Sequence, residues 1–433
     1  MNSHSGAVTS SWPNFEVGQR SLNVRPLQGM RLSDLLRIDR PAQRLLASSG
    51  LVLGGYATST IFVSLFFYVA SGSVYEMALF GLGRYVALIM VSMFVVRAFP
   101  QISPRQLFRF GIVLTALFYL TLILFRTSAV SFVLPLGLFN GSASAIYWFG
   151  NNTLAYDVLE PSERGHYYGL SFAMLSILNV VMPLIGGFVI SKIGGELGYV
   201  AVFAIATLSF CLAWISSRRL KSSSGVGAVS MRHAMILPPR RKGWSLVWSA
   251  IALHGFKQGG ADLGTIVLVE VATHSSSAQG LFVSAASLAG VISSVIAGRL
   301  PRRYRGATMW VGSIAYGGAL VLLVFGSSYP TLIAYGLITG FAYPGLMVPL
   351  SSVVLDVMDS DPSVDLLRGE YVLSREISTN FGRIVAICSL IVLMNYFTTV
   401  RAVLVVLLLA AIFQLLAAYL GRRAFTRYAS TRA

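Results

Sequence analysis

The chain contains twelve apolar blocks, each close to the 20 residues that a helix needs to cross the hydrocarbon core of a bilayer. A helix satisfies its backbone hydrogen bonds internally, which is what a segment in lipid requires. The blocks lie at residues 45–69, 74–97, 107–126, 131–156, 165–192, 197–217, 245–270, 278–299, 306–326, 331–355, 370–396 and 400–421. This spacing predicts an all-α integral membrane protein with twelve transmembrane helices.

The composition supports a membrane protein. The 433 residues are 55% hydrophobic and only 11% charged, whereas a soluble domain has about 25% charged residues. More than 40 residues precede the first block without an apolar run, which argues against a cleaved secretory signal. We therefore expect the N-terminus to stay in the cytoplasm.

The basic residues follow the rule that Lys and Arg concentrate on the cytoplasmic side. Of the 33 Lys and Arg residues, 26 fall in segments on the N-terminal side of the membrane, and only Arg126, Lys192 and Arg401 fall on the other. We predict a multi-pass protein of the cell membrane (plasma or inner), with both termini cytoplasmic. The formal net charge of +17 then needs no nucleic-acid partner, and membrane lipids surround the protein.

An internal repeat is the most specific signal in the chain. When residues 137–160 are laid over residues 336–359, six positions match at a constant offset of 199: Gly137, Leu138, Gly141, Ala143, Asp157 and Val158. The offset spans six blocks, an even number, so both copies run through the membrane in the same direction. The repeat predicts two six-helix bundles.

The repeat also predicts the domain organisation. The segment 218–244 is basic at both ends and rich in Ser and Gly at its centre, which is typical of a flexible linker; its basic ends could also bind anionic lipid headgroups. The expected parts are a cytoplasmic N-terminal segment 1–44, an N-terminal bundle 45–217, a cytoplasmic linker 218–244, a C-terminal bundle 245–424 and a cytoplasmic tail 425–433.

Two short motifs resemble those of a known family. "GRLPRRYRG" (298–306) is similar to the loop pattern G-x-L-x-D-R-x-G-R through Gly298, Leu300 and Arg303, although Arg302 stands where that pattern has Asp. "MPLIGG" (182–187) is similar to the tail of an antiporter pattern, G-x-x-x-G-P-x-x-G-G, through Pro183, Gly186 and Gly187.

With the six-plus-six blocks, these motifs identify a resemblance to the major facilitator superfamily, in its 12-span form, over residues 45 to about 424. The resemblance implies a secondary transporter that works by alternating access as a monomer, and the motif at 182–187 favours an antiporter. It implies no cofactor, no metal and no catalytic residues, and the chain has no P-loop, HExxH motif or nucleophile elbow. Proton coupling is also implied by the resemblance.

Polar residues inside the blocks predict where a substrate binds. Glu376, Asn380 and Arg383 are spaced i, i+4, i+7 and so share one helical face; the repeat maps the last two onto Ser176 and Asn179. A second polar stripe consists of Asn140, Ser144, Tyr147 and Asn151. Such faces line an aqueous cavity or pack polar groups between helices, and both interpretations stay open.

The helical rise places several of these residues at one depth. Arg84, Lys257 and Arg383 lie roughly 13 to 21 Å from the inner ends of their blocks. Four basic residues lie deep within the blocks, and the acids deep within them are Asp262 and Glu376. This surplus indicates an anionic ligand or a Lys257 that has lost its proton. The acids are the candidates for proton coupling, because burial favours a protonated carboxyl group; the alternative is a fixed interhelical ion pair.

The sequence therefore favours proton-coupled export of a small organic or amphipathic compound. Uptake or exchange of a small organic anion is the alternative, and a non-transporting receptor or scaffold is a candidate of a different class. The substrate-cavity candidates are Arg84, Asn140, Ser144, Tyr147, Trp148, Asn151, Ser176, Asn179, Lys257, Asn380 and Arg383.

Overall fold

A computed structural model describes residues 39–98, 102–158, 164–220, 232, 234–235, 242–299, 304–324 and 326–429. Most of the predicted N-terminal segment 1–44 and of the linker 218–244 lies outside the described residues, and so does the end of the tail 425–433.

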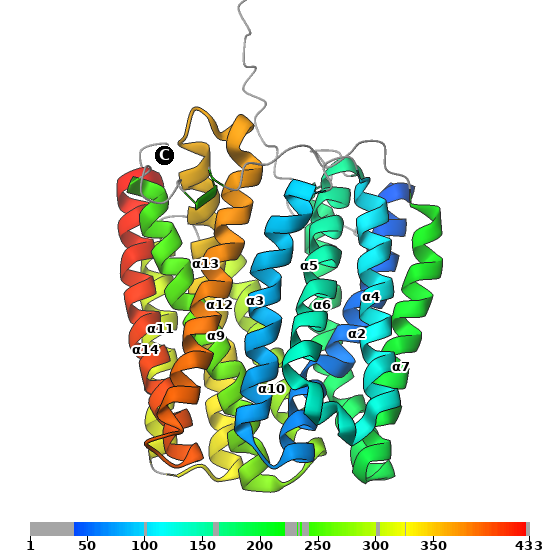
Figure 1. Cartoon of the computed structure of the whole chain (residues 1–433). Helices are drawn as coiled ribbons and strands as arrows, with labels where there is room; N and C mark the ends of the chain where they lie inside the picture. Colours follow the sequence, from blue (N-terminus) through cyan, green and yellow to red (C-terminus); the bar gives the residue numbers. More distant parts are fainter. Residues whose placement is uncertain are drawn as a thin grey trace, which may run out of the picture. The chain divides into compact units, whose positions relative to one another are not determined.

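Long helices follow one another through the described residues (Figure 1). The N-terminal half contains α2 (Arg40–Ser71), α3 (Val74–Ala98), α4 (Pro104–Phe125), α5 (Val133–Val158), α6 (Arg164–Ile193) and α7 (Gly195–Ser216). The C-terminal half contains α9 (Lys242–Thr273), α10 (Ser276–Arg299), α11 (Arg305–Val324), α12 (Tyr329–Asp359), α13 (Val364–Leu393) and α14 (Thr399–Ala424). Short helical segments η1 (Arg126–Phe132), η2 (Ser217–Arg219) and η4 (Phe425–Ala429) adjoin them.

Each predicted apolar block overlaps one of these long helices. By length and composition, 10 segments of the described chain could cross a membrane; one of them, Pro104–Ala155, contains both α4 and most of α5, and α9 is not among them. The chain is thus an all-helical multi-pass membrane protein in the part that the structure describes. That all twelve long helices cross the bilayer stays a prediction.

Local sequence explains where helices begin and end. Ser103 starts α4 with a capping box, because its hydroxyl accepts the Gln106 N–H at 3.3 Å while Gln106 Oε1 accepts the Ser103 N–H at 3.1 Å. Gly72 ends α2 in a left-handed conformation (φ 66°) that side chains disfavour. We use Gly72 and Arg40, at opposite ends of α2, to name the two ends of the bundle: the Gly72 end and the Arg40 end.

The two halves use the same set of helix contacts. In the N-terminal half α3 packs on α5, α4 on α5 and α7, and α2 on α6 and α7. In the C-terminal half the corresponding helices pack in the same way, α10 on α12, α11 on α12 and α14, and α9 on α13 and α14. When the helices of each half are numbered in chain order, each contact joins the same two positions in both halves.

The halves meet through two principal contacts, α6 with α10 and α3 with α13. These contacts correspond to each other when the halves are exchanged, since the second and fifth helices of one half contact the fifth and second of the other. In Figure 1, α3 and α10 lie between the two groups of helices. The interior space between the halves is therefore bordered by helices from both.

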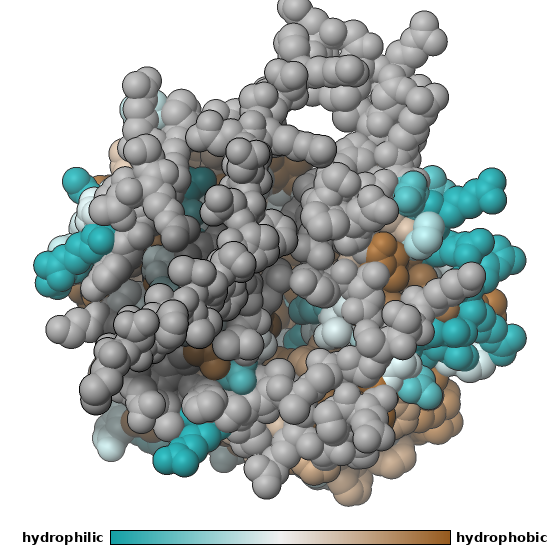
Figure 2. All heavy atoms as spheres, turned by 90° about the horizontal axis from the view of Figure 1, so that it is seen from above, coloured by the Kyte–Doolittle hydropathy of each residue, from teal (hydrophilic) through white to brown (hydrophobic). Residues whose placement is uncertain are grey.

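Charged residues distinguish the two ends. At the Gly72 end, Arg126 lies in η1, Lys192 in the last turn of α6 and Arg401 in the first turn of α14. The opposite end carries many more basic residues, including Arg40, Arg44, Arg218, Arg219, Arg422 and Arg427, and Figure 2 shows hydrophilic residues at its rim. This is the same partition of basic residues that the sequence predicts.

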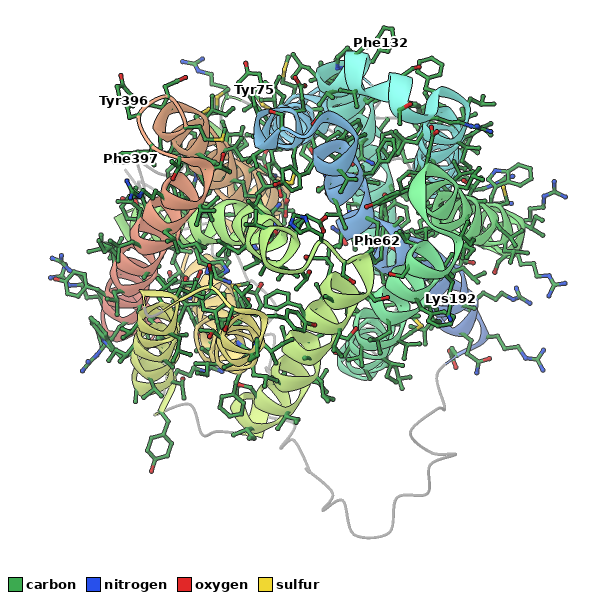
Figure 3. The ribbon with its side chains drawn as sticks, turned by 90° about the horizontal axis from the view of Figure 1, so that it is seen from below. Phe62, Tyr75, Phe132, Lys192, Tyr396 and Phe397 are labelled. Atoms are coloured by element: carbon green, nitrogen blue, oxygen red, sulfur yellow. The ribbon has the colours of Figure 1, made fainter. Side chains whose placement is uncertain are left out.

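Aromatic residues surround the Gly72 end. Figure 3 looks onto this end and shows Tyr75, Phe132, Tyr396 and Phe397 around its edge; each is at least 46% exposed. Amphipathic and apolar rings are typical of the membrane–water interface.

Candidate functional site

A cavity of about 570 Å³ lies between the two halves, within the size range of small-molecule sites. Its walls come from α2, α3 and α6 of the N-terminal half and from α9 to α13 of the C-terminal half. The polar residues that line it are Thr60, Ser64, Arg84, Tyr85, Ser176, Asn179, Lys257, Gln258, Asp262, Thr265, Gln279, Ser287, Ser294, Tyr316, Tyr335, Thr339, Tyr343 and Arg383.

Three cations from three helices share this cavity. Arg84 projects from α3, Lys257 from α9 and Arg383 from α13. Among the described residues, Asp262 is the acidic side chain that lines it. The structure brings these four residues, three of which were predicted to lie at one depth, to one space.

Arg383 is held in a hydrogen-bond network. Its Nε and Nη2 both donate to Gln258 Oε1, at 3.1 and 2.8 Å, and its Nη1 donates to Asn380 Oδ1 at 3.0 Å. Gln258 Nε2 in turn donates to the Tyr343 hydroxyl at 3.1 Å. The guanidinium also lies over the ring of Tyr85, 5.2 Å from its centroid. Side chains of α3, α9, α12 and α13 therefore fix its orientation.

Lys257 lies between two aromatic rings. Its Nζ is 4.9 Å from the centroid of Tyr316 and 4.7 Å from that of Tyr343, within the range of a cation–π interaction. The residue is only 8% exposed. Within the described part of the chain its ammonium has no hydrogen-bond acceptor, so its hydrogen-bonding capacity is available to the cavity.

Small residues bring the helices close enough for these contacts. On α9, Gly255 and Gly259 approach the α13 backbone at Thr379 and Arg383, and a Cβ at Gly259 would lie 2.8 Å from the Arg383 carbonyl oxygen. This close approach, typical of membrane helices, lets Gln258 reach Arg383. The neighbouring face of α9, with Gly260 and Gly264, contacts Val406 and Val403 of α14 instead.

Asp262 faces the cavity with its side chain exposed to that space. Lys257, Arg383 and Arg84 interact with it electrostatically, Lys257 most strongly. Within the described residues, no hydrogen bond or ion pair joins its carboxylate to a protein group. Asp262 therefore is not part of a closed salt bridge, which was the alternative interpretation of its place in the sequence.

The predicted polar stripe of α5 packs inside the N-terminal half. Asn151 Oδ1 accepts the Ser49 hydroxyl at 2.9 Å, and Ser144 Oγ lies 3.5 Å from the Tyr56 hydroxyl. Tyr147 is buried, with its ring 6.0 Å from that of Tyr56. Asn140 is buried too, and none of these four lines the cavity. This stripe packs polar groups between helices, one of the two interpretations left open above.

Other predicted residues are divided between the cavity and its surroundings. Ser176 and Asn179 line the cavity from α6. Asn380, only 1% exposed, contacts it through Arg383. Trp148 is 40% exposed and lies outside the cavity. Glu376 is exposed, away from the cavity, although it shares a helix with Arg383.

The antiporter-like motif lies at helix contacts. Gly186 packs against Phe62 of α2, and Gly187 approaches the Ser276 carbonyl at the start of α10. Pro183 contacts Gly280, also on α10. The motif thus supports the contact of α6 with both α2 and the opposite half. Of the loop motif, Gly298 lies in the last turn of α10, while Leu300 and Arg303 lie outside the described residues.

Three neutral residues that line the cavity were not predicted, because no pattern in the sequence distinguishes them. Gln258, Tyr316 and Tyr343 are neutral and occur in helices rich in similar residues. Glu270 is a further addition: it is a buried acid of α9, 9% exposed, with Oε2 unpaired in the described structure. Its position at the edge of an apolar block concealed it: it lies three residues before the end of α9 at Thr273. The prediction that Asp262 and Glu376 are the acids deep in the spans stays a prediction.

The helix arrangement and the central cavity together define a class: the chain has the fold of the major facilitator superfamily, a fold of membrane transporters. Solved transporters share it. A bacterial homologue of the iron transporter ferroportin, in its inward-facing state, aligns with TM-score 0.67 and 15% identity over 90% of this chain and 99% of its own. The nucleoside transporter NupG aligns with TM-score 0.67 and 14% identity over 89% of this chain and 100% of its own.

Sequence comparison adds relatives. No protein-family model matches the chain. It is 29% identical over 350 residues to "Uncharacterized protein YqgE" of Bacillus subtilis (strain 168), covering 80% of this chain and 81% of the relative. A shorter match of 115 residues, 29% identical, joins it to the MFS-type transporter ppzB of Metarhizium majus (strain ARSEF 297), over 27% of this chain and 24% of the relative.

Proposed function

We propose that this protein is a secondary active transporter that moves a small molecule by alternating access. The observation that carries the proposal is the cavity, because its walls are divided between two halves that meet mainly through two helix pairs. A rotation of one half against the other would open the cavity first to one side and then to the other. The matching helix contacts of the halves support the proposed internal repeat, with bundles 45–217 and 245–424.

We propose that contacts between the halves close the cavity at the Gly72 end. Ser277 of α10 donates its hydroxyl to Ser191 Oγ of α6 at 2.7 Å and lies 3.2 Å from the Gly187 carbonyl oxygen. Nearby, the hydroxyls of Tyr199 and Ser276 lie 3.4 Å apart. These polar contacts are few and reversible, as a gate between two states requires.

The partition of basic residues supports an orientation with the Arg40 end in the cytoplasm. In this orientation the closed Gly72 end faces outward and the structure represents an inward-facing or occluded state. A monomeric transporter, which the resemblance implies, is part of the proposal.

Two substrates follow from the sequence. Export of an organic or amphipathic compound in exchange for protons is one, with Asp262 as the residue that carries the proton. Uptake or exchange of a small organic anion is the other, and the three cations around the cavity support it. Glu376 has less support as a coupling residue, because it lies outside the cavity.

A labelling experiment tests alternating access without knowledge of the substrate. Ser287 lines the cavity from α10; Ser287→Cys is made in a chain whose exposed cysteines, Cys211 and Cys388, are replaced by Ala. A membrane-impermeant maleimide is applied to right-side-out and to inside-out vesicles. A transporter is labelled from both sides, because each vesicle samples both states.

The same chain with Ser191→Cys and Ser277→Cys supplies the second half of the test. The hydroxyls of these serines are 2.7 Å apart, so a disulfide should form readily upon oxidation. Once the Gly72 end is locked, Ser287→Cys should react only in inside-out vesicles, and reduction should restore labelling from both sides. Labelling from one side only, unchanged by oxidation, would contradict the proposal and favour a receptor or scaffold.

A further inference from the structure

We propose that the cavity binds an amphipathic organic carboxylate, with its carboxylate at Lys257 and its apolar body toward the Gly72 end. The inference rests on the proposed transport function and names the substrate class of the same site. It arises from the arrangement of charges and apolar residues around the cavity.

The charges of the lining are not balanced by the protein. Arg84, Lys257 and Arg383 contribute three positive charges and Asp262 one negative charge. Within the described structure none of the three cations forms an ion pair with Asp262. Positive charge in a membrane-embedded site is costly unless it is paired, so an anion that enters from water gains from this surplus, whereas a lipophilic cation is repelled.

The cations differ in what they can offer to a ligand. Arg383 already directs Nε and Nη2 to Gln258 and Nη1 to Asn380, so its fork is not free to clamp a phosphate. The Lys257 ammonium and the Arg84 guanidinium have no hydrogen-bond acceptor among the described residues. Among the described residues, the lining residue nearest a helix N-terminus is Gln279 in the first turn of α10, and its backbone N–H already donates to the Ser275 carbonyl, so it is not available to a phosphate. A carboxylate fits these donors best.

Part of the apolar lining lies toward the Gly72 end, where the buried Gln279 also lines the cavity. Phe80, Ile266 and Phe282 are six or seven residues from the ends of their helices there, about 9–11 Å along the axis. Arg84 and Arg383 are about 15 Å from that end by the same measure, and Lys257 is about 24 Å from it. A ligand that enters from the Arg40 end would place its apolar body against Phe80, Ile266 and Phe282 and its carboxylate beside the cations.

Tyrosine rings beside the cations make the cavity selective for amphipathic ligands. Tyr316 and Tyr343 hold the Lys257 ammonium by their faces, and Tyr335 also lines the cavity. Such walls favour contact with a flat or hydrocarbon body. A small hydrophilic dicarboxylate would leave this apolar surface uncovered.

The test measures thermal stabilisation of the purified full-length protein, because a ligand that binds the native state raises the melting temperature. The probes are 2-naphthoate and 4-phenylbutyrate. Each is compared with its uncharged amide and with an amine of the same skeleton, and inorganic phosphate and succinate are included. We expect the two carboxylates to raise the melting temperature in a concentration-dependent manner, with little effect of the amides, the amines, phosphate or succinate.

Variants link the effect to Lys257. Lys257→Gln should weaken carboxylate binding about 30-fold or more, as expected on removal of one partner of a buried charge pair, and Lys257→Arg should restore part of it. Lys192→Gln is the matched control: it removes the same charge from an exposed position at the Gly72 end and should bind as the wild type does. If Lys257→Gln fails to fold, Arg84→Gln takes its place and should likewise weaken carboxylate binding.

Three outcomes would overturn the inference. They are stronger stabilisation by an amine or by phosphate than by the carboxylates, no stabilisation by either carboxylate, and equal binding by Lys257→Gln and Lys192→Gln. The labelling of Ser287→Cys uses no ligand, so it separates the two proposals. Labelling from both sides without carboxylate binding indicates a transporter of another substrate class, while carboxylate binding with labelling from one side indicates a binding protein that does not transport.

Discussion

Arg383 donates two hydrogen bonds to a single oxygen of Gln258, from Nε at 3.1 Å and from Nη2 at 2.8 Å. Gln258 thereby joins α13 to α9, and its amide nitrogen extends the link to Tyr343 on α12. Tyr343 in turn lies against the Lys257 ammonium. One neutral side chain thus positions two of the three cations of the cavity.

Gln258→Leu should lower the stability of the protein. The change removes the acceptor of two charged hydrogen bonds from a partly buried guanidinium, and each such bond contributes about 1.5–3 kcal/mol. The measurement is thermal unfolding in detergent. Gln258→Glu keeps an acceptor at the same place and should retain the melting temperature, while its added negative charge should weaken carboxylate binding. A wild-type melting temperature for Gln258→Leu would contradict this role.

Asp262→Asn should abolish accumulation of substrate driven by a proton gradient but preserve exchange of substrate across the membrane. The asparagine cannot carry a proton, and exchange needs no net proton movement. Proteoliposomes with an imposed pH gradient separate the two activities, and the variant should lose its response to that gradient.

Glu376→Gln is the control for this experiment, because Glu376 is exposed and lies outside the cavity. It should accumulate substrate as the wild type does. Full accumulation by Asp262→Asn would exclude Asp262 as the coupling residue and direct attention to Glu270, the buried acid nearer the Gly72 end.

Gly187→Ala should loosen the closure of the Gly72 end. A Cβ at this position would lie 2.5 Å from the Ser276 carbonyl oxygen, and a backbone atom moves less readily than a side chain. Overpacking of this kind costs about 1–3 kcal/mol, which corresponds to a shift of roughly five- to 150-fold between closed and open states.

The readout is disulfide formation between Ser191→Cys and Ser277→Cys, which should be slower in the Gly187→Ala background. Gly318→Ala is the matched control: it replaces a glycine within α11 where an added Cβ meets no atom within 4 Å. Equal rates of disulfide formation in both backgrounds would show that Gly187 has no part in the closure.

The orientation of the chain predicts opposite labelling of two cysteines. Tyr396, which is 78% exposed at the Gly72 end, is expected outside the cell, and Gly225, which lies beyond the described residues, is expected in the cytoplasm. In the background without Cys211 and Cys388, Tyr396→Cys should react with an impermeant maleimide in intact cells and Gly225→Cys only after permeabilisation. The reverse pattern would overturn the orientation.

Much of the fold follows from the chain itself. A bilayer-spanning segment must satisfy its own backbone hydrogen bonds, so the apolar blocks predict the positions of the long helices without knowledge of their neighbours. The same regularity of the helix gives the depth of a residue: by the fixed rise per residue, Arg84 and Arg383 lie about 15 Å from the Gly72 end and Lys257 about 24 Å from it.

The candidate site was predictable only in part, because a helical face does not specify what packs against it. Glu376 and Arg383 share a face by periodicity, yet Arg383 lines the cavity and Glu376 does not. Asn151 and Ser144 form a stripe as regular as that of α13, but Ser49 and Tyr56 cover it.

The sequence by itself determined the membrane class, the positions of the helices and the partition of basic residues, since these depend on local hydrophobicity, on the helical period and on charge counted along the chain. Only the tertiary structure decided that Gln258 holds Arg383, that Tyr316 and Tyr343 enclose Lys257, and that Asp262 rather than Glu376 faces the cations. Those relationships join residues far apart in the chain, and they depend on close helix approach at glycines such as Gly255 and Gly259. Helix packing through small residues depends on the surfaces of both helices in a pair. The sequence of one helix alone therefore does not predict it.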